Sequence, residues 1–300
     1  MTAGLRHIVN QGERKCTILI KMYLRCLRPH QWSKNLLVFA APFTAGTFSK
    51  FGDLTQLIFL FLIFCAASST NYVLNDWLDK DFDSQHIQKK HRPFAAGKIG
   101  RKSFVLLLVS LFSVQILLSF LIPHHVLLWV FTYLLISLSY SIYFKNVAVV
   151  EMFLVAVGFM FRALAGAAAI EVDASSWFLI VIGFGALFLV ANKRLAEINY
   201  QISSLTRGVI DQYSATFLKI IIGSSMTVCL IGYTLWAFQD SNGTAFSKFS
   251  VITFAMALMR YLWITDRENG EKPEVILFTD KVMVGLGIIS ISLIAGAIYA

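Results

Sequence analysis

The chain has 300 residues, of which 57% are hydrophobic and 14% are charged, and its mean hydropathy is +0.68. A soluble domain is nearer half apolar and a quarter charged, so this composition excludes an ordinary soluble protein. The formal net charge of +9 raises nucleic acid as a partner. The placement of the basic residues follows membrane topology instead, so we expect no nucleic acid.

Charge-poor stretches of about bilayer length follow one another along the chain. After a weaker first stretch at residues 36–48, they are residues 54–73, 104–122, 126–144, 147–169, 177–191, 217–238, 249–264 and 282–299. A backbone that faces lipid must satisfy its own hydrogen bonds, so each span is expected to be a helix. The predicted fold class is an all-α polytopic membrane protein with about nine transmembrane helices.

Lysine and arginine lie on alternate connections between these spans. They concentrate before residue 35, in the connection at residues 75–102 and in every second connection after it. The connections in between hold only Lys50 and Lys248. This pattern follows the positive-inside rule and predicts a cytoplasmic N-terminus. No linker or low-complexity segment interrupts the chain. We therefore expect a cytoplasmic tail at residues 1–21 and one transmembrane domain at residues 22–300.

An acidic segment follows the second span directly, at residues 75–83. If the helix continues, Asn75, Asp79, Asp83 and Asp76 fall at about 0°, 40°, 80° and 100° around its axis, and Asp81 falls at about 240°. Carboxylates stacked at this spacing repel one another at a helix C-terminus unless a cation lies between them. Hard oxygen ligands of this kind suit Mg²⁺ bound together with a substrate phosphate.

Basic residues follow within a few positions of the acidic segment. A diphosphate needs both metal and guanidinium contacts, and Arg92, fixed before Pro93, is the candidate for the latter. For Lys89, Lys90 and their neighbours, a role in setting topology is equally open. Arg162 lies inside a span, where a charge is costly, so it is a functional candidate or else a charge paired at the helix end.

These residues resemble the UbiA prenyltransferase superfamily. The family's first motif, N-D-x-x-D-x-x-x-D, matches residues 75–83, and its R-P-x-x-x-G segment matches residues 92–97. The resemblance covers essentially the whole chain and implies nine helices around a central cavity that is open to lipid at its side. It further implies Mg²⁺ at a polar cap, with Asn75, Asp76, Asp79 and Asp83 as ligands and Asp79, Asp83 and Arg92 as catalytic residues.

The second acidic motif of this family is altered. Its place reads A-N-K-R-L-A-E at residues 191–197, so Glu197 is the remaining carboxylate beside Lys193 and Arg194. With the start L-R-P-H-Q-W-S-K-N at residues 27–35, this loop is similar to one branch, the decaprenyl-phosphate phosphoribosyltransferases. The resemblance implies further substrate-binding residues, namely Arg28, Lys34, Asn75, Arg162, Lys193, Arg194 and Glu197.

The resemblance to this branch implies a reaction at the cytoplasmic face of a bacterial inner membrane. A 5-phosphoribosyl group would pass from phosphoribosyl diphosphate to a polyprenyl phosphate, with diphosphate released, for cell-wall or surface-polysaccharide synthesis. The alternative is a prenyl transfer from a prenyl diphosphate to an aromatic acceptor such as 4-hydroxybenzoate, which the altered second motif disfavours. A secondary transporter would predict an internal repeat and charged or helix-breaking residues near mid-membrane. The sequence shows no repeat, and its polar residues cluster at one face of the membrane.

Overall fold

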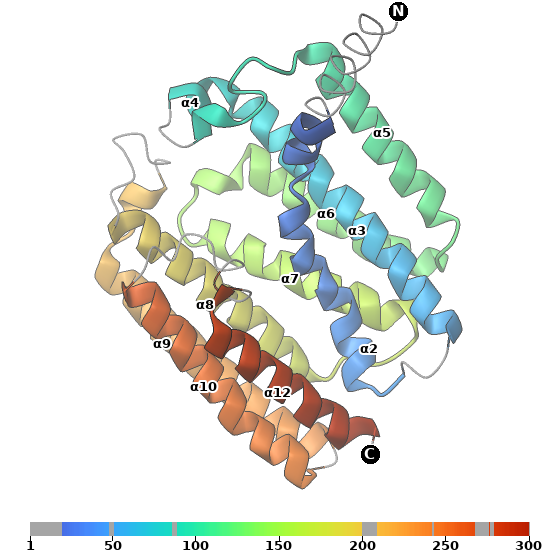
Figure 1. Ribbon diagram of the computed structural model, residues 1–300, viewed down its shortest axis with the longest axis vertical. Coiled ribbons are helices and arrows are strands. Elements are labelled where there is room, and N and C mark those ends of the chain that lie inside the picture. The colour runs from blue at the N-terminus through green and yellow to red at the C-terminus, as the bar shows by residue number, and fades with distance from the viewer. Residues whose placement is uncertain are drawn as a thin grey trace, which may run out of the picture. The chain divides into compact units, whose positions relative to one another are not determined.

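A computed structural model of the chain describes residues 20–47, 51–85, 89–199, 209–241, 243–267, 276 and 279–299. Every regular element within these ranges is a helix, as Figure 1 shows, which confirms the predicted all-α class. Residues 1–19 of the expected N-terminal tail lie outside the described part of the chain. A helix runs from residue 20 to residue 27.

Eight helices of the described chain are long and apolar enough to cross a membrane. They are α3 (Phe51–Leu78), α5 (Arg101–Ser119), α6 (His124–Ile142), α7 (Val150–Ala169), α8 (Ser176–Asn199), α9 (Ala215–Leu235), α10 (Ala245–Arg267) and α12 (Lys281–Tyr299). Each contains or overlaps one of the eight long stretches expected from the sequence. A π-helical turn, η5 (Trp236–Asp240), continues α9.

The weaker first stretch has a different form from the regular helix that was expected. It is a 3₁₀-helix, η1 (Pro29–Phe39), followed by the short helix α2 (Ala40–Thr44). Gly166 of α7 explains the close packing of this segment, because a Cβ atom there would lie 1.9 Å from the Val38 carbonyl oxygen. Taken end to end, η1 and α2 rise by about 30 Å, since a 3₁₀-helix advances about 2.0 Å per residue.

The contacts of the chain fall into two compact units. Unit 1 comprises Met1–Ser33 and Cys65–Leu117, and unit 2 comprises Lys34–Phe64 and Leu118–Ala300, so α3 contributes to both. A single domain over residues 22–300 remains a prediction.

Unit 1 is built on an aromatic cluster where α3 ends. The Trp77 ring stacks on Phe104 of α5 with centroids 4.5 Å apart, and the Phe94 ring meets both edge-on. Buried Cys26, Val73 and the partly buried neighbours of this cluster complete its core. The short helices α4 (Lys80–Gln85) and η2 (Lys89–His91) lie between α3 and α5 in the chain and pack on each other.

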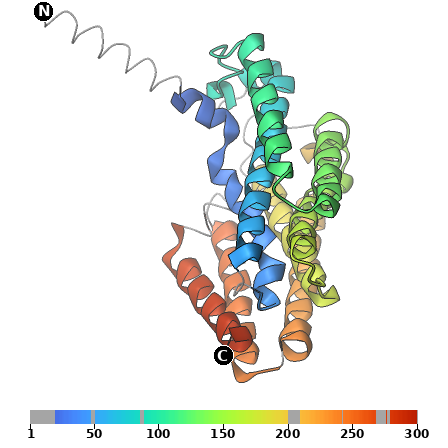
Figure 2. The same ribbon diagram turned by 90° about the vertical axis from the view of Figure 1, so that its right-hand side faces the viewer.

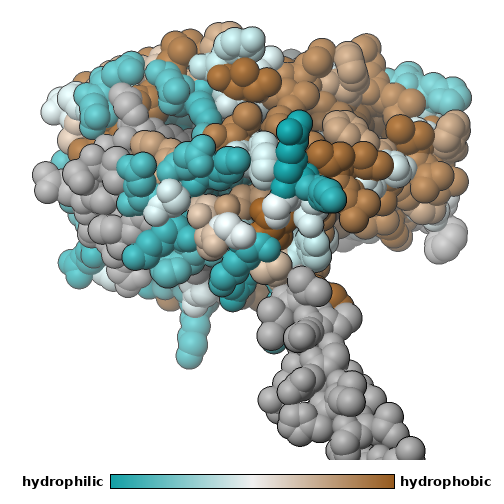
Figure 3. All heavy atoms as spheres, turned by 90° about the horizontal axis from the view of Figure 1, so that it is seen from above, coloured by the Kyte–Doolittle hydropathy of each residue, from teal (hydrophilic) through white to brown (hydrophobic). Residues whose placement is uncertain are grey.

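Unit 2 contains the remaining spans as successive neighbours. Helices α6, α7, α8, α9 and α10 each contact the next, and α12 packs beside α10, as both Figure 1 and Figure 2 show. The largest buried cluster includes Phe188 of α8 and Tyr261 of α10. The space-filling view of Figure 3, which draws the atoms of both units, shows many hydrophobic side chains at the surface. Exposed apolar side chains on most spans suit a multi-pass membrane protein.

Candidate functional site

The acidic segment keeps helical geometry across the junction of α3 and α4. The Asp79 amide donates to the Asn75 carbonyl at 2.9 Å, and the Asp83 amide donates to the Asp79 carbonyl at 2.8 Å. As the predicted stripe requires, Asp76 and Asp83 are buried, each with 2% of its surface exposed, whereas Asp81 is exposed. Two carboxylates of the motif are therefore withdrawn from bulk water.

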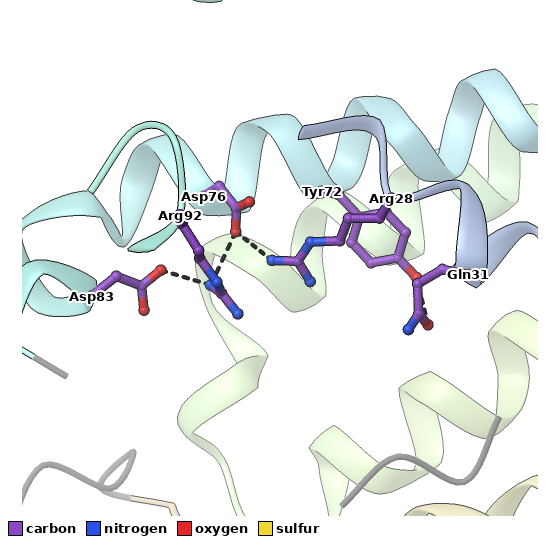
Figure 4. A network of polar contacts seen from close by, with 6 residues as sticks. All are labelled: Arg28, Gln31, Tyr72, Asp76, Asp83 and Arg92. Atoms are coloured by element: carbon purple, nitrogen blue, oxygen red, sulfur yellow. Dashed lines mark hydrogen bonds and ion pairs between the residues drawn. The ribbon is translucent and has the colours of Figure 1, made fainter. Parts of the chain in front are cut away.

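Two arginines hold these buried carboxylates, as Figure 4 shows. The Arg92 Nη1 atom lies 3.0 Å from Asp76 Oδ1 and 2.6 Å from Asp83 Oδ2. The Arg28 Nη2 atom lies 2.6 Å from the same Asp76 oxygen. Within the described part of the chain, each guanidinium uses one nitrogen for these contacts. Since a guanidinium carries five N–H donors, several donors remain for an anionic ligand.

The segment after Arg92 folds into a tight turn that fixes this arginine. The Ala96 amide donates to the Arg92 carbonyl at 2.8 Å, and Gly97 closes the turn with a φ of 68°. Glycine adopts this left-handed conformation without the penalty of a Cβ atom. Phe94 anchors the turn in the aromatic core of unit 1. The R-P-x-x-x-G pattern thus positions one guanidinium against the acidic stripe.

Arg28 has an unusual backbone conformation, with a φ of 52° immediately before Pro29. Such values are uncommon for residues other than glycine and persist where the surroundings impose them. Here the guanidinium is held by Asp76 and lies over the Tyr72 ring, 5.0 Å from its centroid. The Tyr72 hydroxyl in turn donates a hydrogen bond to Gln31 Oε1 at 3.5 Å (Figure 4).

A cavity of about 340 Å³ opens beside Arg28 in unit 1. Three of its lining side chains are cationic and a fourth is a histidine; the full lining is Lys21, Leu24, Arg25, Arg28, Pro29 and His30. Such a lining suits an anionic group attached to an apolar body. Behind it, burial raises the pKa of the Cys26 thiol to about 12, and the Asp76 carboxylate adds to the increase.

The oxygen atoms of the acidic stripe fit a magnesium ion that a substrate helps to coordinate. Among the described residues, no three His, Cys, Asp or Glu side chains gather closely enough to hold a metal alone. Magnesium needs only one or two carboxylates when waters and phosphates complete its shell. The Asn75 Oδ1 atom is buried and has no hydrogen-bond partner within the described ranges, so it is available as a further hard ligand.

In unit 2, Arg194 forms a buried ion-pair network. Its Nε and Nη2 atoms each lie 2.7 Å from an oxygen of Glu151, and its Nη1 atom lies 2.6 Å from Glu197 Oε2. Glu151 has no exposed surface and Arg194 has 4%. The Val149 amide donates to the Tyr213 hydroxyl at 2.7 Å, beside Glu151. Burial raises the pKa of Tyr213, which keeps this hydroxyl neutral.

The structure places residues 191–197 in the last turns of α8 and not in the loop that the sequence suggested, and this network gives the altered motif a structural role. Arg194 is fully engaged by two carboxylates, while its neighbour Lys193 is partly exposed and Glu197 is neutralised by Arg194. Glu151 was missed by the sequence analysis, although a lone acid in an apolar span was a usable signal. Of the two predicted cations, Lys193 is the less buried.

A second buried arginine, Arg162, is held in unit 2 by neutral partners. It donates to Asn35 Oδ1 at 2.7 Å, to the Gly158 carbonyl at 2.7 Å and to the Tyr133 hydroxyl at 2.8 Å. No carboxylate among the described residues pairs with it. Its charge is therefore solvated by dipoles and by the Tyr133 ring. Lys34, the neighbour of Asn35, is partly buried.

Comparisons with known proteins agree with one another. The model of the UbiA prenyltransferase family matches residues 36–282. The decaprenyl-phosphate phosphoribosyltransferase of Corynebacterium glutamicum is 33% identical over 286 residues, 92% of this chain and 86% of that protein. The Mycolicibacterium smegmatis protein of the same name is 31% identical, covering 94% and 93%. A UbiA homolog from Archaeoglobus fulgidus bound to GPP and Mg²⁺ shares the fold, with a TM-score of 0.68, 17% identity and coverage of 93% and 100%.

Proposed function

The chain belongs to the UbiA prenyltransferase family, and from this premise we propose that it is a phosphoribosyltransferase of the membrane. It transfers a 5-phosphoribosyl group from phosphoribosyl diphosphate to a polyprenyl phosphate of the decaprenyl type and releases diphosphate. The observation that supports a diphosphate donor is the network at the end of α3, in which Arg28 and Arg92 contact the buried carboxylates of Asp76 and Asp83. The two relatives named above support the choice of donor.

The donor diphosphate binds at the acidic stripe. Asn75, Asp76, Asp79 and Asp83 are the residues that would hold Mg²⁺, with Asn75 also meeting the substrate. The ion would neutralise the diphosphate and stabilise it as a leaving group. Arg92 and Arg28 direct their remaining N–H donors to the phosphate oxygens, in the geometry that guanidinium groups favour. These residues act by positioning and by charge, so no general base is needed.

The altered second motif favours a donor with an additional phosphate. A prenyl donor carries only its diphosphate, whereas phosphoribosyl diphosphate has another phosphate at C5. Lys193 is the candidate cation for this group, and the ion pairs of Arg194 with Glu151 and Glu197 fix the end of α8 that carries it. Arg162 remains a candidate substrate-binding residue, since its buried charge has only neutral partners.

The acceptor is an amphiphile with an anionic head. Its phosphate suits the basic cavity beside Arg28, and Lys34 is a further candidate contact. A phosphate oxygen is already ionised at neutral pH and attacks C1 as the diphosphate leaves. The isoprenoid tail lies along apolar helix surfaces. We place the N-terminus and the site at the cytoplasmic face of a bacterial inner membrane, where positive charge concentrates.

A second candidate function is prenyl transfer from a prenyl diphosphate to an aromatic acceptor such as 4-hydroxybenzoate. The likeness to the Archaeoglobus fulgidus homolog favours prenyl transfer, because that protein has the same fold and is bound to GPP and Mg²⁺. The diphosphate site alone serves either donor.

A comparison of donors separates the two functions. Membranes containing the protein are incubated with polyprenyl phosphate and either phosphoribosyl diphosphate or a prenyl diphosphate with 4-hydroxybenzoate, and lipids are analysed by mass spectrometry. We expect a phosphoribosylated polyprenyl lipid from the first mixture alone. A prenylated aromatic product, with no phosphoribosylated lipid, would replace our proposal by the second function.

A further inference from the structure

One polar side chain within the span of α3 has no structural role in the hydrogen-bond network. Asn71 has 8% of its surface exposed, and both its Nδ2 and Oδ1 atoms are buried with no hydrogen-bond partner among the described residues. Its neighbours are satisfied: Ser69 donates to the Leu27 carbonyl, and Thr70 donates to the Ala66 carbonyl and accepts from Gln115. Buried amides without partners are rare and need an explanation.

Asn71 lies on the face of α3 that carries the diphosphate motif. It precedes Asn75 by four residues, and Asn75 precedes Asp79 by four, so the three follow one another along the helix. The Oδ1 atom of Asn75 is likewise buried and without a partner in the described chain. Asn71 therefore extends the polar stripe by four residues, about 6 Å along the helix, away from the carboxylates and into the span.

From this position we infer that Asn71 binds a hydroxyl group of the donor's sugar ring and so selects a sugar donor over a prenyl donor. The inference rests on the proposed function. Next to its diphosphate, phosphoribosyl diphosphate carries hydroxyls at C2 and C3. A hydroxyl both donates and accepts, which matches an amide that offers the N–H donors of its NH2 group and an acceptor oxygen.

The selectivity follows from what each donor does to the amide. A sugar hydroxyl that reaches Asn71 gives hydrogen bonds to atoms that have none in the described structure, so no internal bond is lost. A prenyl chain at the same place leaves the amide without partners. Sites that hydrogen-bond a substrate hydroxyl discriminate strongly against analogues without one, because buried polar groups are then left unpaired.

The test is the variant Asn71→Leu, of similar size, in the full-length protein. We expect kcat/KM for phosphoribosyl diphosphate to fall about 10- to 100-fold, the loss of one or two hydrogen bonds. Inhibition by inorganic diphosphate stays within about twofold of wild type, because the carboxylate end is intact. The melting temperature stays equal or rises, because an unsatisfied buried amide has been removed. Asn192→Leu is the stability control: that amide donates to the Phe188 carbonyl and accepts from Thr265, so its loss lowers the melting temperature.

A donor lacking the 2- or the 3-hydroxyl completes the test. One of these analogues reacts more slowly than the normal donor with wild type but equally well with Asn71→Leu. The inference is overturned if Asn71→Leu keeps normal kcat/KM, or if diphosphate inhibition weakens as much as kcat/KM does. Should Asn71→Leu fail to fold, Asn71→Ala is measured in the same way. If wild type uses no phosphoribosyl diphosphate and transfers a prenyl group instead, the proposed function is wrong and the inference about Asn71 is wrong with it.

Discussion

At the scale of single residues, the site depends on buried charges whose partners are distant in sequence. Arg92 lies nine residues from Asp83, but Arg194 lies 43 residues from Glu151 and Arg162 lies 127 from Asn35. The acidic stripe was predictable, because helical spacing places Asp76 and Asp83 on the opposite side from Asp81. The Glu151–Arg194 pair was not, because no local pattern specifies which spans meet.

Arg92 is predicted to serve both stability and transfer. In Arg92→Ala the buried Asp83 carboxylate loses its arginine, and the free energy of unfolding falls by about 1–3 kcal/mol. Adding Asp83→Asn removes the unpaired charge, so the double variant recovers part of that stability but no activity. Denaturation in detergent and turnover measure the two effects. A double variant with restored turnover would show that the pair is only structural.

Substitutions of Lys193 and Arg194 are predicted to change different properties of the protein, substrate binding for Lys193 and stability for Arg194. Arg194→Ala leaves Glu151 buried without its partner and lowers the free energy of unfolding by about 3–5 kcal/mol. Lys193→Ala changes stability by about 1 kcal/mol or less, but raises the KM for phosphoribosyl diphosphate. Thermal unfolding and steady-state kinetics of both variants are compared. An unchanged KM in Lys193→Ala would show that this end of α8 does not contact the substrate.

At the scale of elements, the eight long spans followed from hydropathy, and the form of the first segment did not. The extended rise of η1 lets 16 residues cover a distance close to the hydrocarbon thickness of about 30 Å. Residues 29–35 of η1 are mostly polar, so hydropathy marked only the shorter stretch at residues 36–48. The close packing of this segment depends on α7, where Gly166 admits the backbone of Val38. A glycine in a distant span carries no such information by itself.

Gly166 is therefore predicted to be irreplaceable for packing within unit 2. In Gly166→Ala the new methyl group meets the Val38 carbonyl, and the free energy of unfolding falls by about 1–3 kcal/mol or more. Gly285→Ala on α12 is the matched control, because no atom lies within 4 Å of its added Cβ. That variant should be neutral or slightly stabilising. Equal melting temperatures for the two variants would contradict the packing described for η1.

At the scale of the whole molecule, composition and motifs were enough to predict a multi-pass helical protein of the UbiA prenyltransferase family. The same family fold serves different donors, so fold alone does not choose the substrate. We assign that choice to particular side chains, namely Lys193 in the altered motif at the end of α8 and the unsatisfied amide of Asn71. The latter was not visible in the sequence, since a buried asparagine is recognised only from its missing partners.

The most direct measurement follows the two ends of the donor in wild type and Asp79→Asn. Phosphoribosyl diphosphate labelled at the C5 phosphate should transfer its label to the lipid, and donor labelled in the diphosphate should release its label to water. Both should require added Mg²⁺, stop on chelation and fall at least about 1,000-fold in Asp79→Asn, which remains inserted. Labelled lipid formed at a normal rate by Asp79→Asn at saturating Mg²⁺, or without any divalent ion, would contradict the diphosphate site proposed at the end of α3.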